Sequence, residues 1–523
     1  MALATGAARR GGSLKVRAAS RAAIVQAWRL LRRGPSTRWG AVIVGLAFVL
    51  SSIWYSARGI RFDISTLPYF DQLLDPILLR TRLWQSLYYL HGQPPLFNLL
   101  AGVALKLEPD LPQLLLKPVF LLAGLYTGLC LYFTLVRLRV PVAIGASIAC
   151  LAVSSPAFVL HENWFFYPHL NVAWLLGAFA WLAQSRGRPG LEMSLAASHW
   201  AGLCLTRSLF HPLYFLLTAG LVVWRVAPGA RRKAALCFLV PGLLLGGWCA
   251  KNQALFGFFG TSSWGSRNLS HAVETLVGKN RVRAEARAGR LSPAIKVGPF
   301  ATGTRNVKAF GLTPRETGIP ALDQVDKQIR SHHSLSYNHW SYPASAHFYA
   351  EDARELISAY PVTYLTGLYQ QSLPFFLLPV DADGFLSPNR EAIAKEVQVF
   401  DALDGSLAFD VVIGVGLGLA LLASLDLVTA RGERIVLSAG LLTVVWVISV
   451  GLVGELGENN RFRFKIVWLS WALAAAGYAA AARAGRVFFD ESLLGHCQRG
   501  VALLRDKGRL ILGRAAQPRE SER

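Results

Sequence analysis

Long hydrophobic stretches alternate with short arginine-rich connections along most of the chain. A helix that crosses a bilayer of about 30 Å needs roughly 20 apolar residues. Apolar windows of about this length occur at 39–57, 114–136, 142–160, 168–184, 193–209, 211–226, 234–250, 407–428, 435–454 and 464–482. We therefore predict an all-α polytopic membrane protein with about ten transmembrane helices and further helices along the membrane surface.

Two other apolar stretches are shorter or interrupted. Residues 96–107 (LFNLLAGVALKL) are too few to span a bilayer and suit an interfacial helix. Prolines and a pair of glutamines interrupt residues 358–379, so this segment is interpreted as interfacial or re-entrant. Whether either segment spans the membrane stays open from the sequence.

Lys and Arg residues in the connections indicate the orientation, because cytoplasmic loops carry an excess of them. Placing the N-terminus inside makes the clusters at 137–139, 186–188, 225–233 and 431–434 cytoplasmic, together with the C-terminal tail. Two large regions, 58–113 and 251–406, then lie outside.

This topology divides the chain into five parts. They are a basic cytoplasmic segment (1–38), a transmembrane catalytic module with the first outside loop at 58–113 (39–250), a large extracytoplasmic loop region (251–406), the C-terminal transmembrane helices (407–482) and a basic cytoplasmic tail (483–523).

Composition supports the membrane assignment. Of the 523 residues, 53% are hydrophobic and 16% are charged, against roughly 25% charged residues in soluble domains, so a soluble class is excluded. The net charge of +23 is concentrated in the two ends. Basic ends beside apolar spans are typical of cytoplasmic segments at an anionic membrane surface, and we expect no nucleic-acid partner. The high Ala, Arg and Gly content favours a bacterial cell (inner) membrane.

The first outside region contains three candidate general bases, Asp63, Asp71 and Asp75. Leucine and isoleucine residues recur at helical spacing from Asp71 onward, which predicts an amphipathic helix on the membrane. Asp71 would open this helix, where the helix dipole stabilises a carboxylate. Any of the three acids could equally be a solvated helix cap.

Other candidate site residues cluster on the same predicted face. Glu162 lies in HENWFFYPHL, between two apolar windows, where an ionisable group is costly and therefore a functional candidate. Arginines at this boundary suit a phosphate, although they could simply extend from the membrane toward water. The candidate substrate-binding residues are His91, Gln93, Arg207, His211, Lys251, Asn252, Glu458, Arg461 and Arg463.

The stretch HGQPPLFNLL (91–100) predicts a sharp turn into a helix. Pro94 biases Gln93 toward an extended backbone, and Pro95 suits the first helical turn. His91 and Gln93 would then face the rim of the site. A plain loop-to-helix junction is the alternative.

We expect neither a cofactor nor a metal site. His332, His333, His339 and His347 precede Glu351 and Asp352, but their spacing fits no tight ligand pattern. A divalent metal is thus possible in principle but not indicated.

With these features in place, the chain resembles a GT-C superfamily glycosyltransferase, in the branch that includes protein O-mannosyltransferases and lipid A aminoarabinose transferases. The resemblance covers most of residues 39–482 and rests on layout: one span, an acid-bearing outside loop, a surface helix and the corner Gln93-Pro94-Pro95-Leu96. Family members often have lysine before the two prolines, where this chain has glutamine. Glu162 matches the acid of the second outside loop, and Arg461 matches the late arginine-bearing loop.

The resemblance implies a hexosyl or pentosyl transferase that moves a sugar from a polyprenyl-phosphate carrier to a protein, lipid or glycan acceptor, with inversion. It implies a first-loop acid as base, for which Asp71 competes with Asp75. The family's adjacent acidic pair is absent. Glu162 would orient the acceptor, and Arg207, Lys251, Arg461 and Arg463 are candidates to stabilise the departing phosphate. A flippase or transporter of a lipid-linked substrate is the main alternative, and a non-catalytic scaffold is a third.

Overall fold

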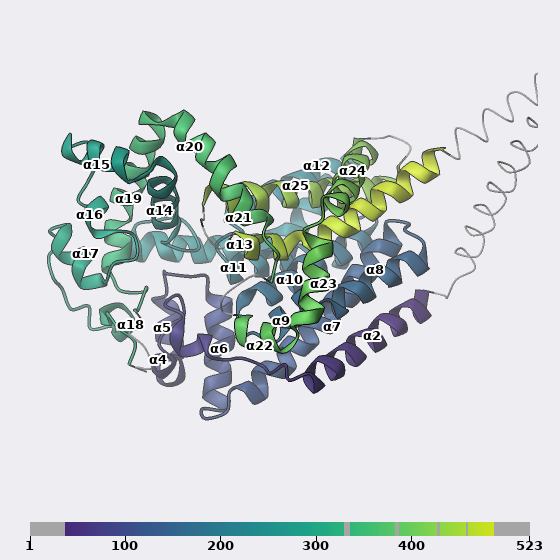
Figure 1. Ribbon diagram of the computed structural model, residues 1–523, viewed down its shortest axis with the longest axis horizontal. Helices are drawn as coiled ribbons and strands as arrows, with labels where there is room; N and C mark the ends of the chain where they lie inside the picture. The colour runs from purple at the N-terminus through teal and green to yellow at the C-terminus, as the bar shows by residue number, and fades with distance from the viewer. Residues whose placement is uncertain are drawn as a thin grey trace, which may run out of the picture.

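The computed structural model describes residues 37–328, 335–381, 386–425, 429–454, 456 and 459–485, and these residues form helices joined by loops (Figure 1). The described residues also form two isolated β-bridges. Most long helices gather in one bundle, and shorter helices such as α15 and α17 lie together at one end of it, on the left in Figure 1. The all-α class predicted from the sequence is confirmed.

Among the described residues, six helices are long and apolar enough to cross a membrane, or seven if one bent pair counts as a span. These helices indicate a multi-pass integral membrane protein. Large apolar side chains such as Leu50, Leu243 and Leu422 are exposed on them, as lipid-facing residues would be. The six are α2 (Thr37–Ala57), α7 (Gln113–Arg137), Pro228–Phe256, which comprises the turn η1 (Pro228–Ala230) and α13 (Arg231–Phe256), α24 (Leu407–Leu425), α25 (Arg431–Val453) and the C-terminal helix Asn460–Gly485.

Three predicted windows form helices that fall short of this criterion. They are α10 (Tyr167–Ser185), α11 (Leu191–Thr206) and α12 (Pro212–Arg225). Helix α10 is almost entirely buried because it packs against α7, α11 and α25. A central helix of this kind faces protein rather than lipid, so it can carry polar residues such as Asn171 and His169.

The window at 142–160 is bent rather than straight. Helix α8 (Val142–Ser154) ends at Ser155, and α9 (Pro156–Glu162) begins there at an angle of 55°. Ser155 is extended and caps α9 through its side chain, and Pro156 occupies the first helical position. A serine followed by proline is a strong helix start, which explains the break.

The predicted amphipathic helix of the first outside region does not begin at Asp71. Its helices are α3 (Thr66–Tyr69), α4 (Pro76–Thr81), α5 (Leu83–Tyr88) and α6 (Pro95–Leu107). Asp75 is the cap residue of α4, because Pro76 sets the first helical position and disfavours helical backbone before it. The prediction that Asp71 opens the helix is therefore wrong. Leu73 and Leu74 are buried in a protein core, and Leu78 is also buried.

The corner at residues 94 and 95 has the predicted form. Pro94 is extended, with φ −61° and ψ 155°, and Pro95 begins α6. The segment after the corner is therefore a helix of 13 residues, close to the predicted 96–107.

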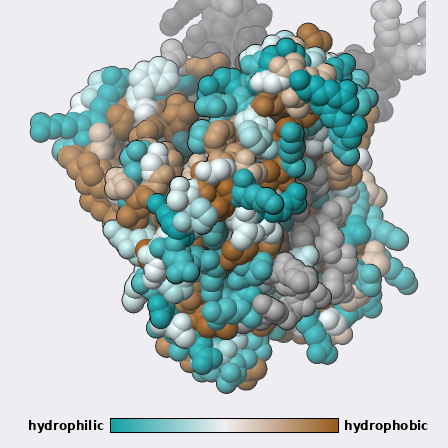
Figure 2. Space-filling view, turned by 90° about the vertical axis from the view of Figure 1, so that its left-hand side faces the viewer, coloured by the Kyte–Doolittle hydropathy of each residue, from teal (hydrophilic) through white to brown (hydrophobic). Residues whose placement is uncertain are grey.

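The described residues of 251–406, predicted to form the second outside region, fold into helices around a small core that includes Val273 and Leu356. Hydrophilic side chains cover much of the face at this end of the molecule (Figure 2). Its helices are α14 (Gly265–Val277), α15 (Lys279–Arg287), α16 (Ala294–Val297), α17 (Gly303–Ala309), α18 (Pro320–Asp323), α19 (Ser341–Ala359), α20 (Pro361–Gly367), the π-helical turn η2 (Leu368–Ser372), α21 (Leu373–Leu377), α22 (Ser387–Ala392) and α23 (Ala394–Asp404).

Candidate active site

The two predicted outside regions pack against each other although about 250 residues separate them in sequence. The Gln328 N–H donates to the Asp75 carboxylate (2.7 Å), and the His91 N–H donates to the Asn338 side chain (2.8 Å). The Tyr337 N–H donates to the Asp71 carbonyl (3.3 Å). These contacts bring the first-loop aspartates under the second region.

Asp75 acts as a structural cap. One carboxylate oxygen accepts the Ile77 N–H (2.8 Å) at the start of α4, and the other accepts the Gln328 N–H. The side chain is 1% exposed. Both oxygens are therefore engaged by backbone donors.

Asp63 is likewise engaged locally, because its carboxylate accepts the N–H (2.8 Å) and hydroxyl (3.0 Å) of Ser65. Its backbone pairs with the segment before α10. The Asp63 N–H donates to the Asn163 carbonyl and the Phe165 N–H donates to the Asp63 carbonyl, both at 2.8 Å. This bridge holds the start of the first outside region beside Phe166 and Tyr167.

Asp71 is half-buried in a turn and faces the second outside region. Burial raises the pKa of its carboxyl group, whereas the Lys327 ammonium and hydrogen bonds from the Leu335 backbone and the Tyr337 side chain oppose that rise. A carboxylate with a raised pKa is a better general base near neutral pH than a fully hydrated one. Of the three aspartates, Asp71 has the environment that suits this role.

Lys327 lies beside Asp71 and was not among the residues singled out from the sequence. Its ammonium group donates to the Phe70 carbonyl and to the Pro68 carbonyl (3.4 Å), and the side chain is 2% exposed. Burial lowers the pKa of Lys327 to about 8, although Asp71 and Asp75 favour its charged form. The lysine thus supplies positive charge to the loop that carries both acids.

Gln72, the neighbour of Asp71, connects this loop to the end of α11. The Arg207 guanidinium donates to the Gln72 side-chain oxygen (2.7 Å) and lies over the Tyr167 ring (4.2 Å to its centroid). The Tyr167 hydroxyl donates to the same oxygen (3.5 Å). Arg207 is 5% exposed, so this cation is held in a largely desolvated setting.

Arg461 packs on Phe166, the aromatic residue next to Tyr167. Its guanidinium lies over Phe166 (5.6 Å), and the Phe166 and Tyr167 ring centroids are 3.8 Å apart. The Phe70 ring also packs against Phe166, with the ring centroids 4.1 Å apart. Two predicted phosphate-binding arginines, from α11 and the C-terminal helix, therefore lie on neighbouring rings beside the Asp71 loop.

The sequence carried little signal for the residues that connect these groups. Gln72 and Tyr167 are adjacent to stretches already singled out, and the HENWFFYPHL aromatics could have been recognised as arginine platforms. Lys327 and Tyr337 lie in a polar loop with no motif around them.

Glu162 lies apart from the Asp71 contacts. Its side chain packs over Gly124 of α7, next to the Phe48 ring of α2, and Lys117 is the charged neighbour that acts on it. Glu162 is 2% exposed, and neither carboxylate oxygen has a hydrogen-bond partner among the described residues. A buried, unpaired acid of this kind is energetically costly.

His91 is fully buried rather than placed at the rim. Its Nδ1 is 2.9 Å from the Ser263 hydroxyl and its Nε2 is 3.0 Å from the Asn338 carbonyl. Burial lowers the pKa of His91 to about 3, so the ring is neutral at physiological pH. Gln93 is also buried. This corner therefore ties the two outside regions together.

Lys251 and Asn252, at the end of α13, contact backbone carbonyls. The Lys251 ammonium donates to Leu90 (2.7 Å) and Tyr88 (3.1 Å) at the end of α5 and lies over the Trp248 ring. The Asn252 side chain donates to the Gly260 carbonyl (2.7 Å). Both residues hold loops in place in this structure.

His211 and Arg463 also have local partners. His211 caps α12 by accepting the Leu213 N–H (3.2 Å). Arg463 forms a two-pronged ion pair with Asp404 (2.6 and 3.3 Å), which connects the C-terminal helix to α23. Glu458 lies outside the described residues.

Among the described residues, no group of three or more His, Cys, Asp or Glu side chains is arranged to hold a metal ion. His332 and His333 lie outside that part of the chain. His339 is 2.9 Å from the Ser341 hydroxyl, and Asp352 accepts from the backbone and hydroxyl of Ser292.

A groove of about 600 Å³ between α14, α15 and α16 is a separate feature of the second outside region. Basic side chains line it, including Lys279, Arg283 and Lys296, and none of the predicted site residues does. Comparison with known proteins adds no relative: no family model, curated protein or solved structure matches the chain.

Proposed function

We propose that this chain is an integral-membrane glycosyltransferase that moves a sugar from a polyprenyl-phosphate carrier to an extracytoplasmic acceptor with inversion. In this proposal about ten helical segments enter the membrane, both ends are cytoplasmic, and the site faces outward from a bacterial cell membrane. The basic clusters at the opposite ends of the helices support that orientation.

One observation carries the proposal. Asp71 and Gln72 are consecutive, and they join two sets of groups: Asp71 interacts with Lys327, and Gln72 binds Arg207. Arg461 lies on the ring next to that of Arg207. A candidate base and two desolvated guanidinium groups, drawn from distant segments, thus lie around one loop.

This arrangement suits inverting transfer. The Asp71 carboxylate would take the proton of an acceptor hydroxyl while that oxygen forms a bond to the anomeric carbon. The bond from the anomeric carbon to the carrier phosphate breaks, and polyprenyl phosphate leaves with the electron pair. Arg207 and Arg461 would stabilise the charge that develops on the departing phosphate, because desolvated cations act strongly there.

The test is sugar transfer by the purified chain, reconstituted in vesicles with radiolabelled polyprenyl-phosphate sugars. Asp71→Asn should lower turnover by about 10²-fold or more, since it removes the general base. Asp63→Asn is the matched control and should retain turnover, because that carboxylate is held by the N–H and hydroxyl of Ser65. Full turnover by Asp71→Asn, or equal losses in both variants, would refute the assignment of Asp71.

A flippase or transporter of a lipid-linked substrate is the second candidate. It is favoured by the 55° break between α8 and α9 together with the buried Glu162 that ends α9, because transporters use broken helices with polar groups at the break. Movement of intact lipid-linked sugar across sealed vesicles, without release or transfer of the sugar, would support this candidate instead.

A further inference from the structure

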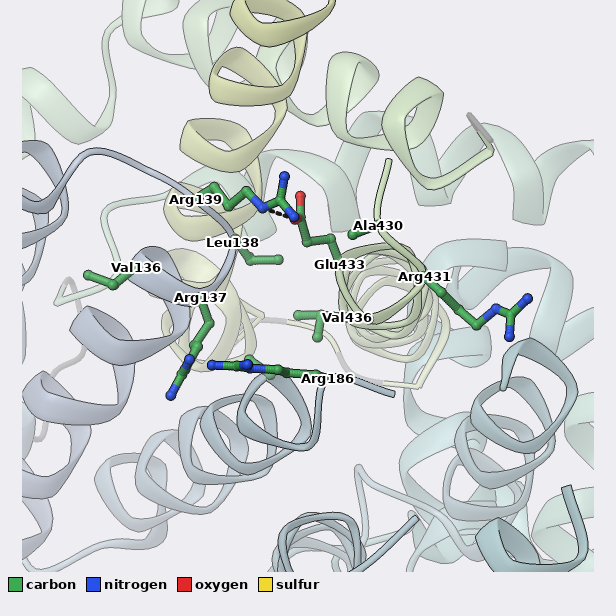
Figure 3. A pocket seen from close by; sticks show the side chains of 11 residues that line it. Val136, Arg137, Leu138, Arg139, Arg186, Ala430, Arg431, Glu433 and Val436 are labelled. Carbon is green, nitrogen blue, oxygen red and sulfur yellow. Dashed lines mark ion pairs between the residues drawn. The ribbon is translucent and has the colours of Figure 1, made fainter. Parts of the chain in front are cut away.

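A second basic site lies at the opposite end of the bundle from Asp71. A pocket of about 420 Å³ opens where α7 and α10 end and α25 begins (Figure 3). Four arginines line it, Arg137, Arg139, Arg186 and Arg431, and Glu433 is the one acidic residue in the lining.

The single carboxylate is already neutralised. Glu433 pairs with Arg139 (2.6 Å) through one oxygen and with Arg483 (2.9 Å) of the C-terminal helix through the other. Its side chain is 8% exposed. Glu433 therefore holds two helix ends together, and both of its oxygens are already paired with arginines other than Arg137 and Arg186.

Arg137 and Arg186 lie side by side in the pocket, and their like charges repel. Neither has an acidic partner in the part of the chain that the structure describes. Arg431 points away from them in Figure 3. Two adjacent guanidinium groups without a counter-charge form a site for an anion, and phosphate matches their planar donor geometry.

The backbone of the pocket is also unusual. Arg139 (φ 61°) and Arg186 (φ 52°) are the two non-glycine residues with positive φ among those described. Each follows the end of a helix, α7 or α10, where glycine is the usual residue. A left-handed backbone is strained for a residue that carries a side chain. Both strained arginines line this one pocket, as strained residues often do at functional sites.

The start of α25 completes the site. A Cβ at Gly432 would lie 2.7 Å from the Arg186 backbone, so only glycine allows the 186–187 turn to rest on this helix. The first turn of α25 thereby faces the arginines, and free N–H groups at a helix N-terminus favour an anion. Gly432 thus lets the Arg186 backbone pack against the N-terminus of α25, whose N–H groups add to the positive potential of the arginines.

We propose that this pocket binds a phosphate group between Arg137 and Arg186, with Arg139 and the start of α25 at its edge. Thr37, the first described residue, accepts a hydrogen bond from Tyr132 of α7, and Arg483, which pairs with Glu433 of the pocket, lies two residues before the last described one. The pocket is therefore at the end of the bundle where the described chain begins and ends. An anionic lipid headgroup and a soluble phosphate compound share the required chemistry.

Binding is measured with the purified full-length chain as ligand-induced stabilisation against heat, because a ligand of the folded state raises the unfolding temperature. One arm compares nanodiscs containing phosphatidylglycerol with nanodiscs of phosphatidylcholine. The other arm adds inorganic phosphate or pyrophosphate to protein in detergent. Stabilisation in the first arm identifies a lipid headgroup, and stabilisation in the second identifies a soluble phosphate source.

Arg186→Gly is the key variant, because glycine suits the left-handed backbone and removes the charge without straining the fold. Arg137→Gln tests the other guanidinium group. Both variants should bind the anion that stabilises the unmodified chain at least tenfold more weakly. The ligand-free Arg186→Gly protein should be as stable as the unmodified chain, or more stable. Arg188→Gln removes an exposed charge in the same turn, outside the pocket lining, and should respond as the unmodified chain does. No stabilisation by either anion, or an undiminished response in Arg186→Gly and Arg137→Gln, would overturn the proposal.

Discussion

Asp71 and Asp75 lie four residues apart in one loop, and their surroundings separate two roles that the sequence left open. Both carboxylate oxygens of Asp75 accept hydrogen bonds from backbone N–H groups, whereas Asp71 faces a lysine and a tyrosine of the second outside region. The side chain alone therefore does not decide the role. Its neighbours do, and Lys327 comes from a segment more than 250 residues away.

Asp75→Ala should destabilise the fold by about 1 kcal/mol or more, because it removes a helix cap and leaves the Gln328 N–H without its acceptor. Asp71→Ala should destabilise the fold by a smaller amount. The unfolding temperature of the two variants in detergent, followed by tryptophan fluorescence, measures the difference. A larger loss in Asp71→Ala would contradict the structural role given to Asp75.

Lys327 makes the stability depend on pH in a defined window. Its pKa is about 8 in the folded chain, below the ordinary value of 10.5. Between these values the unfolded chain holds a proton that the folded chain has released, so this group makes stability rise with pH. Below pH 8 both states are protonated, and the cost of burying the charge is fully present. That cost is at most a few kcal/mol, since one pKa unit corresponds to about 1.4 kcal/mol.

The expected result is a gain in unfolding temperature of the unmodified chain, relative to Lys327→Met, as the pH rises from 7.5 to 10. The methionine variant keeps the side-chain volume and removes the titration. Other groups titrate in both proteins, so the difference between the two profiles isolates Lys327. Parallel profiles over this range would contradict the lowered pKa.

At the scale of elements, the hydrophobic pattern predicted most of the long helices because each is a continuous apolar run. Helices α2, α7 and α25 begin or end within a few residues of the predicted windows. The bend at Ser155 was not predicted, because the apolar run continues across it while a cap and a proline restart the helix. The central helix α10 was found, but its length and composition alone do not distinguish a membrane span from a helix buried in protein.

The approach of α7 to its neighbours depends on glycine. A Cβ at Gly124 would collide with the Glu162 carboxylate and lie 2.8 Å from the Phe48 ring, so α2, α7 and α9 meet at this position. Gly124→Ala should therefore lower the unfolding temperature, although alanine is the better helix former by about 1 kcal/mol. Gly246→Ala in α13 is the control, because open space surrounds that position and only the helix gain remains. Equal shifts in the two variants would show that Gly124 does not set the packing.

At the scale of the whole molecule, the sequence predicted that acids and cations would gather on one face, but it could not predict which pairs meet. Several candidate residues, among them His91, Lys251 and Arg463, make contacts within the protein that hold loops or helices together. Their types and positions suit a ligand equally well, so only the tertiary contacts distinguish the two uses. Arg207 and Arg461, both predicted to lie on the outer face, pack on the neighbouring rings of Tyr167 and Phe166, and no sequence motif had indicated these rings as their partners.

The site, the phosphate pocket and the direction of transfer all depend on which ends of the helices share a side of the membrane. Gln85 and Asn280 are exposed in the two outside regions, and Arg188 and Arg232 are exposed in basic connections between helices. Moving these arginine-rich connections across the bilayer would be unfavourable, so we predict that they lie in the cytoplasm. Single cysteines at 85 and 280, in a chain without its native cysteines, should therefore react with a membrane-impermeant maleimide in intact cells. Cysteines at 188 and 232 should react only after permeabilisation. Labelling of 85 and 280 from different sides would separate Asp71 from Lys327, which the packing of the two outside regions does not allow.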